Sequence, residues 1–154
     1  MPRILALSIA ALAFLAAPAL AQIKIGLLVS ATGPTSAIGI PQKNTGEILP
    51  RTIAGESVQY LSLEDGGDAT RAVQNAKKLI QEDHIDALIG PSTTPNAFAI
   101  LDVIAENKLP MMATVGTATV VEPLDAKRRW VCKTTQNGDL SGAALVAQRR
   151  KTGI

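Results

Sequence analysis

Short apolar runs of strand length alternate with segments of helical periodicity from residue 22 onward, and this alternation restricts the fold more than any other feature. The run Ile23 to Val29 is mostly apolar, as in a strand that is covered on both faces of a parallel sheet. Similar runs predict strands at residues 57–63, 85–90, 109–113 and 130–133. Because strands that alternate with helices form parallel sheets with helices on both faces, we predict an α/β fold with a doubly wound, three-layer parallel sheet.

The segments between these runs are typical of helices. Helices are expected at about residues 40–49, 69–80, 94–107 and 139–151, with Gly153 closing the last one. Asp68 should cap the second helix and Thr94 the third, while Pro41 is expected in the first turn of the first helix. In the second helix, apolar residues recur at spacings of three and four and predict one buried face: Ala69, Ala72, Val73, Ala76, Leu79 and Ile80.

The N-terminal segment has the order of a secretory signal peptide. Arg3 supplies a positive charge, residues 4–17 form an uncharged apolar run, and a small-x-small cleavage triplet ends at Ala21. The run is shorter than the ~20 residues that a membrane-spanning helix needs, so no stable membrane anchor is expected. We predict that residues 1–21 are a signal peptide, that cleavage falls between Ala21 and Gln22, and that the product is periplasmic.

Composition predicts a folded chain and argues against nucleic acid as a partner. Hydrophobic residues make up 47% and charged residues 18%, so the chain should bury a core. The net charge is +2, and the basic runs at residues 127–129 and 149–151 are typical of solvated faces, since no basic stripe is interleaved with aromatics. The only cysteine, Cys132, cannot form an internal disulfide and is expected to be a buried structural thiol.

Hydroxyl-rich loops follow three of the predicted strands, at residues 30–38, 90–94 and 114–119. In open parallel sheets, ligands bind at such loops, outside the carboxyl ends of the strands. Ser92, Thr93 and Thr94 precede a helix whose first N–H groups are unpaired and carry a partial positive charge. Together they form an uncharged site for a carboxylate, although Thr94 alone would also fit a plain helix cap.

The other two loops offer fewer contacts. The loop after the fourth strand offers a backbone carbonyl and the Thr117 hydroxyl, or is a plain flexible connection. The first loop offers backbone and apolar contacts through Ala37, Ile38 and Gly39.

Motifs that would indicate an enzyme or a cofactor are missing from the sequence. It contains no G-x-G-x-x-G after the first strand, no phosphate loop, no G-x-S-x-G elbow and no cluster of metal ligands. His84, the only histidine, is expected at a helix end in favourable contact with the helix dipole. Asp65 and Asp68 flank two glycines and are interpreted as turn and cap residues. We therefore expect a protein that is not an enzyme and that needs no cofactor or metal.

Four blocks in one order carry a resemblance to a known family. They are IGLLVSATGP at residues 25–34, LEDGGD and the helix after it at 63–80, DALIGPS at 86–92, and VEP with RWVCKT at 121–134. Together the blocks resemble the leucine/isoleucine/valine-binding proteins of ABC importers, and the resemblance covers residues 22–154.

The resemblance implies the type I periplasmic-binding-protein fold, in which two α/β lobes close on a ligand. It implies that the first lobe holds the carboxylate and amine of the ligand, and that Ile38 stands where relatives often carry an aromatic contact. The positions that match the family's contacts to these two groups are Ser92, Thr93, Thr94, Gly116 and Thr117. Relatives continue into a second lobe that this sequence does not contain, so we expect residues 22–154 to be an N-terminal lobe only, apparently truncated.

The leading hypothesis is the extracytoplasmic solute-binding component of an ABC importer for branched-chain amino acids or related amino-acid-like or amide solutes. Its partners would be the small-molecule ligand and an inner-membrane ABC permease. Three alternatives stay open: a truncated, nonfunctional remnant of such a protein, a ligand-sensing domain of the same fold, and an exported enzyme. A signal peptide with no membrane span after it disfavours the sensor, and the missing catalytic motifs disfavour the enzyme.

Overall fold

The computed structural model describes residues 22–153, so the predicted signal peptide and its last residue, Ala21, lie outside the described range. Six strands form one sheet in the order β2-β3-β1-β4-β5-β6. Their bounds are Ile23–Val29 for β1, Thr52–Ile53 for β2, Glu56–Glu64 for β3, Ala87–Ile89 for β4, Met111–Ala113 for β5 and Val131–Lys133 for β6. Neighbouring strands are parallel except for β2 and β3, which form an antiparallel hairpin.

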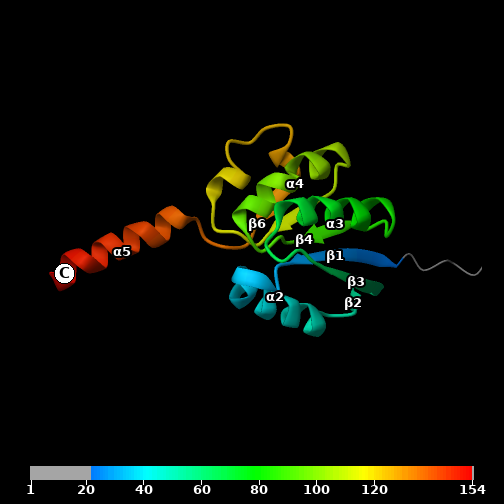
Figure 1. Ribbon diagram of the computed structural model, residues 1–154, viewed down its shortest axis with the longest axis horizontal. Helices are drawn as coiled ribbons and strands as arrows, with labels where there is room; N and C mark the ends of the chain where they lie inside the picture. Colours follow the sequence, from blue (N-terminus) through cyan, green and yellow to red (C-terminus); the bar gives the residue numbers. More distant parts are fainter. Residues whose placement is uncertain (1–21, 154) are drawn as a thin grey trace, which may run out of the picture.

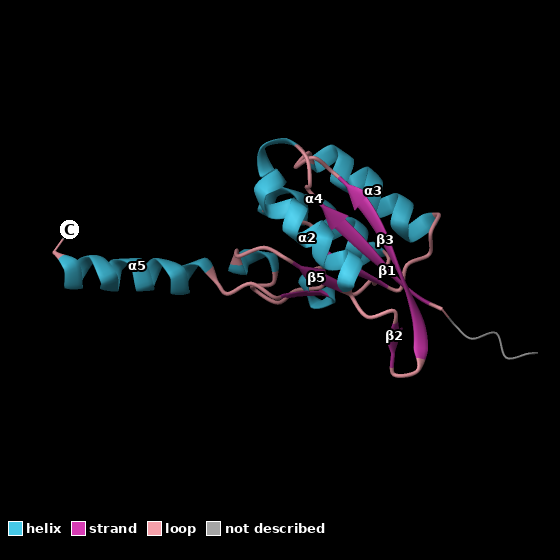
Figure 2. Cartoon of the chain, turned by 90° about the horizontal axis from the view of Figure 1, so that it is seen from below, coloured by secondary structure: helices cyan, strands magenta, loops and turns pink. Residues whose placement is uncertain are grey.

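Helices cover both faces of the sheet, which confirms the predicted three-layer arrangement. Helices α3 (Ala69–Gln81) and α4 (Thr94–Glu106) pack together on one face, and α2 (Ser36–Ile48) packs on the other (Figure 1). Helix α5 (Gly138–Thr152) extends away from the sheet in two views at right angles (Figures 1 and 2). Short 3-10 helices lie in the connections, at Gly33–Thr35, Ala118–Val120 and Arg128–Trp130.

The core lies between the sheet and the layer of α3 and α4. Its largest fully buried apolar side chains come from both layers and from the 3-10 helix Ala118–Val120: Leu28, Leu79, Leu88, Ile100, Ile104, Met111 and Val120. Helix α3 has the predicted buried face, with Ala72, Ala76 and Leu79 wholly inaccessible to solvent. The Asp68 carboxylate accepts a hydrogen bond from the Arg71 N–H at 2.7 Å, which confirms the predicted cap.

Helix α2 begins earlier than the sequence predicted. It starts at Ser36, directly after a 3-10 turn, so Pro41 lies inside the helix and not in its first turn. Pro41 has no N–H to donate to the Ala37 carbonyl, and the helix loses one backbone hydrogen bond there. The buried Gly39 brings this part of the helix against the backbone of Ser30, at the end of β1. This close packing holds the residues before Pro41 in helical conformation.

Two further expectations were wrong. Thr93 occupies the N-cap position of α4, although its side chain makes no cap hydrogen bond, and Thr94 is the first helical residue. Cys132 is exposed and not buried. In the sheet register Cys132 lies opposite Met112, which is 41% exposed, and β6 is the edge strand of the sheet. A side chain on an edge strand has a neighbouring strand on one side only, so the apolar character of its neighbours in the sequence did not predict its burial.

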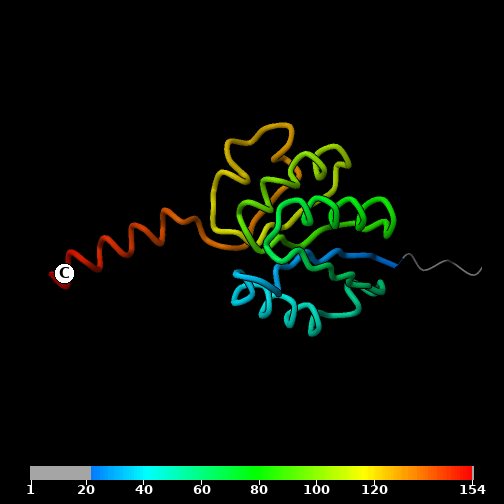
Figure 3. The backbone as a smooth tube through the Cα atoms, in the orientation of Figure 1, coloured from blue at the N-terminus to red at the C-terminus, as the bar shows by residue number. Residues whose placement is uncertain are grey.

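Helix α5 confirms the last predicted helix but makes little contact with the rest of the chain. It ends at Gly153, whose positive φ of 70° is the left-handed conformation that commonly ends a helix. Its apolar side chains are exposed, Leu140 and Leu145 among them, and Figure 3 shows the backbone passing from the sheet into this helix and away. In the range 22–153, none of the helices combines the length and apolarity that crossing a bilayer requires.

Candidate ligand-binding site

The chain diverges at the carboxyl ends of β1 and β4. These strands are neighbours in the sheet, yet β1 leads to α2 on one face and β4 leads to α4 on the other (Figure 1). Such a switch point leaves a crevice beyond the strand ends, where ligands bind in open α/β sheets. The fold therefore brings two of the hydroxyl-rich loops to this one place.

A cavity of about 450 Å³ lies at this crevice. Its lining comes from the three predicted loops, the start of α4 and the segment after β6, and consists of Ile38, Ser92, Thr93, Thr94, Pro95, Thr114, Val115, Gly116 and Thr135. Of the predicted site residues, only Thr117 lies outside this lining, and its hydroxyl is 2.9 Å from that of Thr119. The structure thus gathers the other five predicted residues around one cavity.

The wall formed by α4 offers hydrogen-bond donors without a formal charge. Thr93 is the N-cap and Thr94 the first helical residue, so the unpaired N–H groups of the first turn lie at this wall. The Thr93 hydroxyl oxygen is buried and has no hydrogen-bond partner in the described part of the chain. Every side chain in the lining is uncharged, so attraction for a carboxylate would come from these amides and hydroxyls.

Ser92 lies deeper than its two neighbours and is already bonded. It is 5% exposed, and its hydroxyl oxygen accepts a hydrogen bond from the Ser30 N–H at 3.0 Å. The same hydroxyl donates to the Oε1 atom of Gln42, on α2. Gln42 was not among the predicted site residues, because nothing local marks a glutamine inside a helix as a partner of a distant serine.

A carboxylate behind the cavity ties β1 to β3. The wholly buried Asp65 accepts a hydrogen bond from the Ser30 hydroxyl at 2.5 Å and another from the Gly67 N–H at 2.8 Å. Asp65 is therefore more than the turn residue that the sequence indicated, since it holds the end of β1 in place from behind the site.

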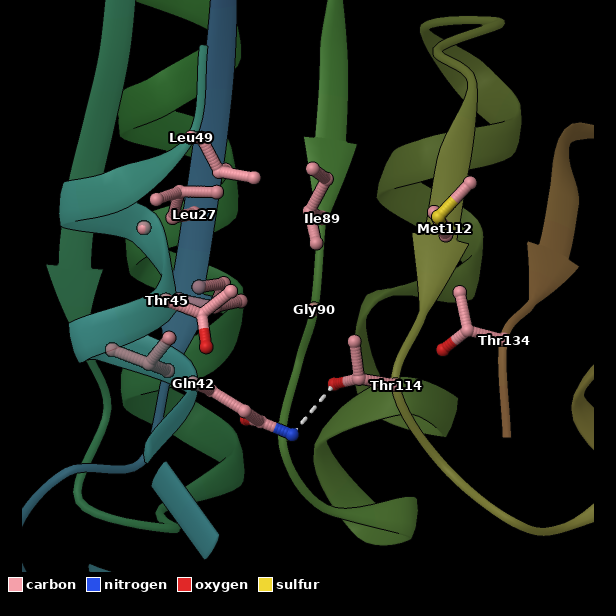
Figure 4. Close-up of a pocket in the computed structure, with 12 residues that line it drawn as sticks. Leu27, Gln42, Thr45, Leu49, Ile89, Gly90, Met112, Thr114 and Thr134 are labelled. Atoms are coloured by element: carbon pink, nitrogen blue, oxygen red, sulfur yellow. Dashed lines mark hydrogen bonds between the residues drawn. The ribbon is translucent and has the colours of Figure 1, made fainter. Parts of the chain in front are cut away.

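A second cavity, of about 330 Å³, lies between α2 and the sheet. Figure 4 shows its lining, in which Leu27, Ile89 and Met112 form an apolar floor. Gln42 and Thr114 stand at one end of it, and the Gln42 amide nitrogen donates to the Thr114 hydroxyl at 3.2 Å (Figure 4). Thr114 lines the larger cavity as well, so it lies where the two cavities adjoin.

Comparison with known proteins gives relatives of one kind. The Leu/Ile/Val-binding protein BraC3 of Rhizobium johnstonii is 35% identical over 116 residues, which make up 71% of this chain and 31% of that protein. An extracellular ligand-binding receptor from Rhodopseudomonas palustris HaA2 superposes with a TM-score of 0.83 at 44% identity, covering 86% of this chain and 37% of the receptor. A leucine-binding protein from Thermotoga maritima superposes with a TM-score of 0.71 at 25% identity, over 84% of this chain and 37% of that one.

These matches share the type I periplasmic-binding-protein fold. The chain spans 31% of the length of the Rhizobium protein and 37% of the two solved structures, so it corresponds to about a third of each relative. The family model for periplasmic binding proteins matches residues 22–153, which is nearly the whole chain. The predicted resemblance is confirmed, and the chain belongs to the periplasmic binding protein family.

Proposed function

We propose that this chain is the ligand-binding N-terminal lobe of an exported solute-binding protein that delivers a small amino-acid-like or amide solute to an inner-membrane ABC permease. The ligand lies in the cavity beyond β1, β4 and β5, with its carboxylate or carbonyl on the first turn of α4. Branched-chain amino acids are the leading ligand class, because relatives named for leucine, isoleucine and valine match most of this chain.

One observation carries the proposal: an uncharged, hydroxyl-lined cavity lies against unpaired helix N–H groups at the switch point of the sheet. The buried Thr93 hydroxyl has no partner within residues 22–153, and a ligand oxygen would supply one. Such groups bind an anionic or carbonyl oxygen without the fixed countercharge that would retain it too strongly for release.

The lining of this cavity comes from one lobe only, and this limits the affinity that we expect. Ligand pockets usually bury ~70–90% of the surface of a bound molecule, and one lobe leaves much of a leucine side chain in water. We expect the chain to bind leucine no better than about millimolar, or about −4 kcal/mol.

Leucine titration of the ¹⁵N-labelled chain, followed by amide chemical shifts, tests the site. Shifts should concentrate at Thr93, Thr94 and Gly116, and the variants Thr93→Val and Thr94→Val should each weaken binding by about tenfold or more, as expected for a lost hydrogen bond to a charged group. Thr93→Val should leave the fold intact, because the hydroxyl that it removes has no partner in the described chain.

Thr70→Val is the matched control, because Thr70 is exposed at the start of α3 and outside the cavity lining. Its affinity for leucine should equal that of the unmodified chain. If leucine shifts amides elsewhere, or if both cavity variants bind as well as the control, the ligand does not occupy this cavity.

A further inference from the structure

A continuous run of hydrogen bonds passes behind the cavity, from the end of β1 to the start of the loop after β4. The Ser30 N–H donates to the Ser92 hydroxyl at 3.0 Å, and that hydroxyl donates to Gln42 Oε1. The other end of the Gln42 amide donates to the Thr114 hydroxyl at 3.2 Å, which donates to the Pro91 carbonyl at 2.8 Å. This run joins β1, α2, β4 and β5 through side chains that are buried or half-buried.

Backbone groups at both ends determine the direction of every bond in the run. The Pro91 carbonyl can only accept, so the single hydroxyl proton of Thr114 is used there. Thr114 must then accept from Gln42, which turns the amide nitrogen toward Thr114 and the amide oxygen toward Ser92.

The other end leads to the same assignment. The Ser30 N–H can only donate, so it occupies one lone pair of the Ser92 oxygen. Gln42 Oε1 can only accept, so it takes the Ser92 proton. The hydroxyl is left with one free lone pair and no free proton.

The Ser92 hydroxyl therefore differs from the neighbouring Thr93 hydroxyl in whether it has a proton to donate. Ser92 lines the cavity and its hydroxyl can only accept a further hydrogen bond, whereas the Thr93 hydroxyl has no partner within the described chain and is free to donate. A ligand that satisfies both needs an N–H or O–H donor next to a carboxylate or carbonyl oxygen.

We propose that Gln42 is a positioning residue that keeps Ser92 an acceptor and so makes the site select ligands with an ammonium or amide N–H next to their carboxyl or carbonyl group. The inference rests on the proposed function, because it concerns the same cavity. Gln42 itself is not in the cavity lining and reaches it only through two lining residues, Ser92 and Thr114.

The test compares leucine with 4-methylpentanoate, the same acid without the amino group, by amide chemical-shift titration of the chain. The unmodified chain should prefer leucine at least tenfold, because the acid leaves a buried acceptor unpaired. Gln42→Met has a similar shape but no amide, so it frees the Ser92 proton to turn toward the carboxylate. The preference should then fall to about threefold or less, mainly through tighter binding of the acid.

Gln42→Glu and Asn44→Met complete the set. Glutamate keeps an acceptor opposite Ser92, and its negative charge also favours an ammonium group, so a preference for leucine of at least tenfold should return. Asn44 is exposed on the same helix, so its replacement by methionine should leave the preference unchanged. Protection of the Ser30 amide from hydrogen exchange should persist in all variants, because its bond to Ser92 does not involve Gln42.

Each failure has a distinct meaning. If leucine and the acid bind in the cavity and the Gln42→Met variant keeps the tenfold preference, or if the unmodified chain shows no preference, the inference is overturned and the proposed function stands. If neither compound shifts the amides of Thr93, Thr94 or Gly116, the proposed function fails and the inference fails with it.

Discussion

Gly39 is where α2 approaches the sheet most closely, and replacing it with alanine should destabilise the protein. A Cβ atom built on Gly39 would lie 2.1 Å from both the carbonyl carbon and the carbonyl oxygen of Ser30, and 2.6 Å from the Ala31 nitrogen. These are backbone atoms of the segment after β1, so no side-chain rotation relieves the overlap. The first half of α2 would have to move outward by about 1.3 Å to lengthen these contacts to 3.4 Å, an ordinary van der Waals separation.

The expected cost combines two opposed effects. Overpacking in a close-packed region typically costs about 1–3 kcal/mol, and backbone atoms on the opposing side favour the upper end. Alanine in place of glycine inside a helix returns about 0.5–1 kcal/mol. We expect Gly39→Ala to lower the free energy of unfolding by about 2 kcal/mol, measured by urea unfolding followed by circular dichroism.

Gly142→Ala is the matched control, because Gly142 lies inside α5 and a Cβ there meets no atom within 4 Å. This variant should keep or raise the stability of α5 and should not lower the urea midpoint. A Gly39→Ala protein that unfolds at the same urea concentration as the unmodified chain would refute the close approach of α2 to β1.

Two further predictions concern a carboxylate and the N-terminal segment. Burial pushes the pKa of Glu64 upward, but hydrogen bonds from the Gly66 N–H and from the Thr32 N–H and hydroxyl outweigh it and leave the pKa below its ordinary value. Its contribution to stability is therefore present above the unfolded pKa of about 4.3 and is lost as the pH falls through the folded pKa, so the advantage over Glu64→Gln should shrink between pH 7 and pH 3 in urea unfolding. An advantage that is equal at both pH values would contradict these contacts. For export, mass spectrometry of the secreted product should find Gln22 at the N-terminus, and a cytosolic protein with Met1 intact would contradict the predicted signal peptide.

The main layers of this fold were predictable because their patterns are local. The three-and-four spacing of Ala72, Ala76 and Leu79, together with the Asp68 cap, specifies α3 without knowledge of the rest of the chain. The apolar run of β1 likewise predicts a strand between two others, which is where it lies.

The sequence did not predict β2 or the early start of α2. The first depends on a turn with an uncommon sequence, and the second depends on a contact with a distant residue. β2 has only two residues and is joined to β3 by Ala54 and Gly55, which both have positive φ, 52° and 89°. An alanine in the first of these positions is a poor indicator of such a hairpin turn, which usually carries asparagine, aspartate or glycine there. The early start of α2 follows from its contact with Ser30, which residues 36–40 alone do not specify.

The location of the candidate site could be predicted from the sequence, but the hydrogen-bonding role of each hydroxyl in it could not. The location was predictable, because loops after parallel strands meet at one edge of the sheet, and the cavity lies there. The sequence could not predict which hydroxyl donates a hydrogen bond and which accepts one, because serine and threonine hydroxyls can each do either. Ser92 and Thr93 are adjacent in the chain and carry the same functional group, yet only Ser92 meets the Ser30 N–H and the Gln42 oxygen.

Under the proposed role of Gln42, ligand preference depends on how α2 docks and not on the cavity lining alone. Gly39 and Gln42 are three residues apart on α2 and so lie on one face of the helix. The contact that Gly39 permits with Ser30 also brings Gln42 within reach of Ser92. Two family members with the same hydroxyls in their loops can therefore present opposite hydrogen-bonding groups to a ligand, if their second helices carry different residues at the position of Gln42.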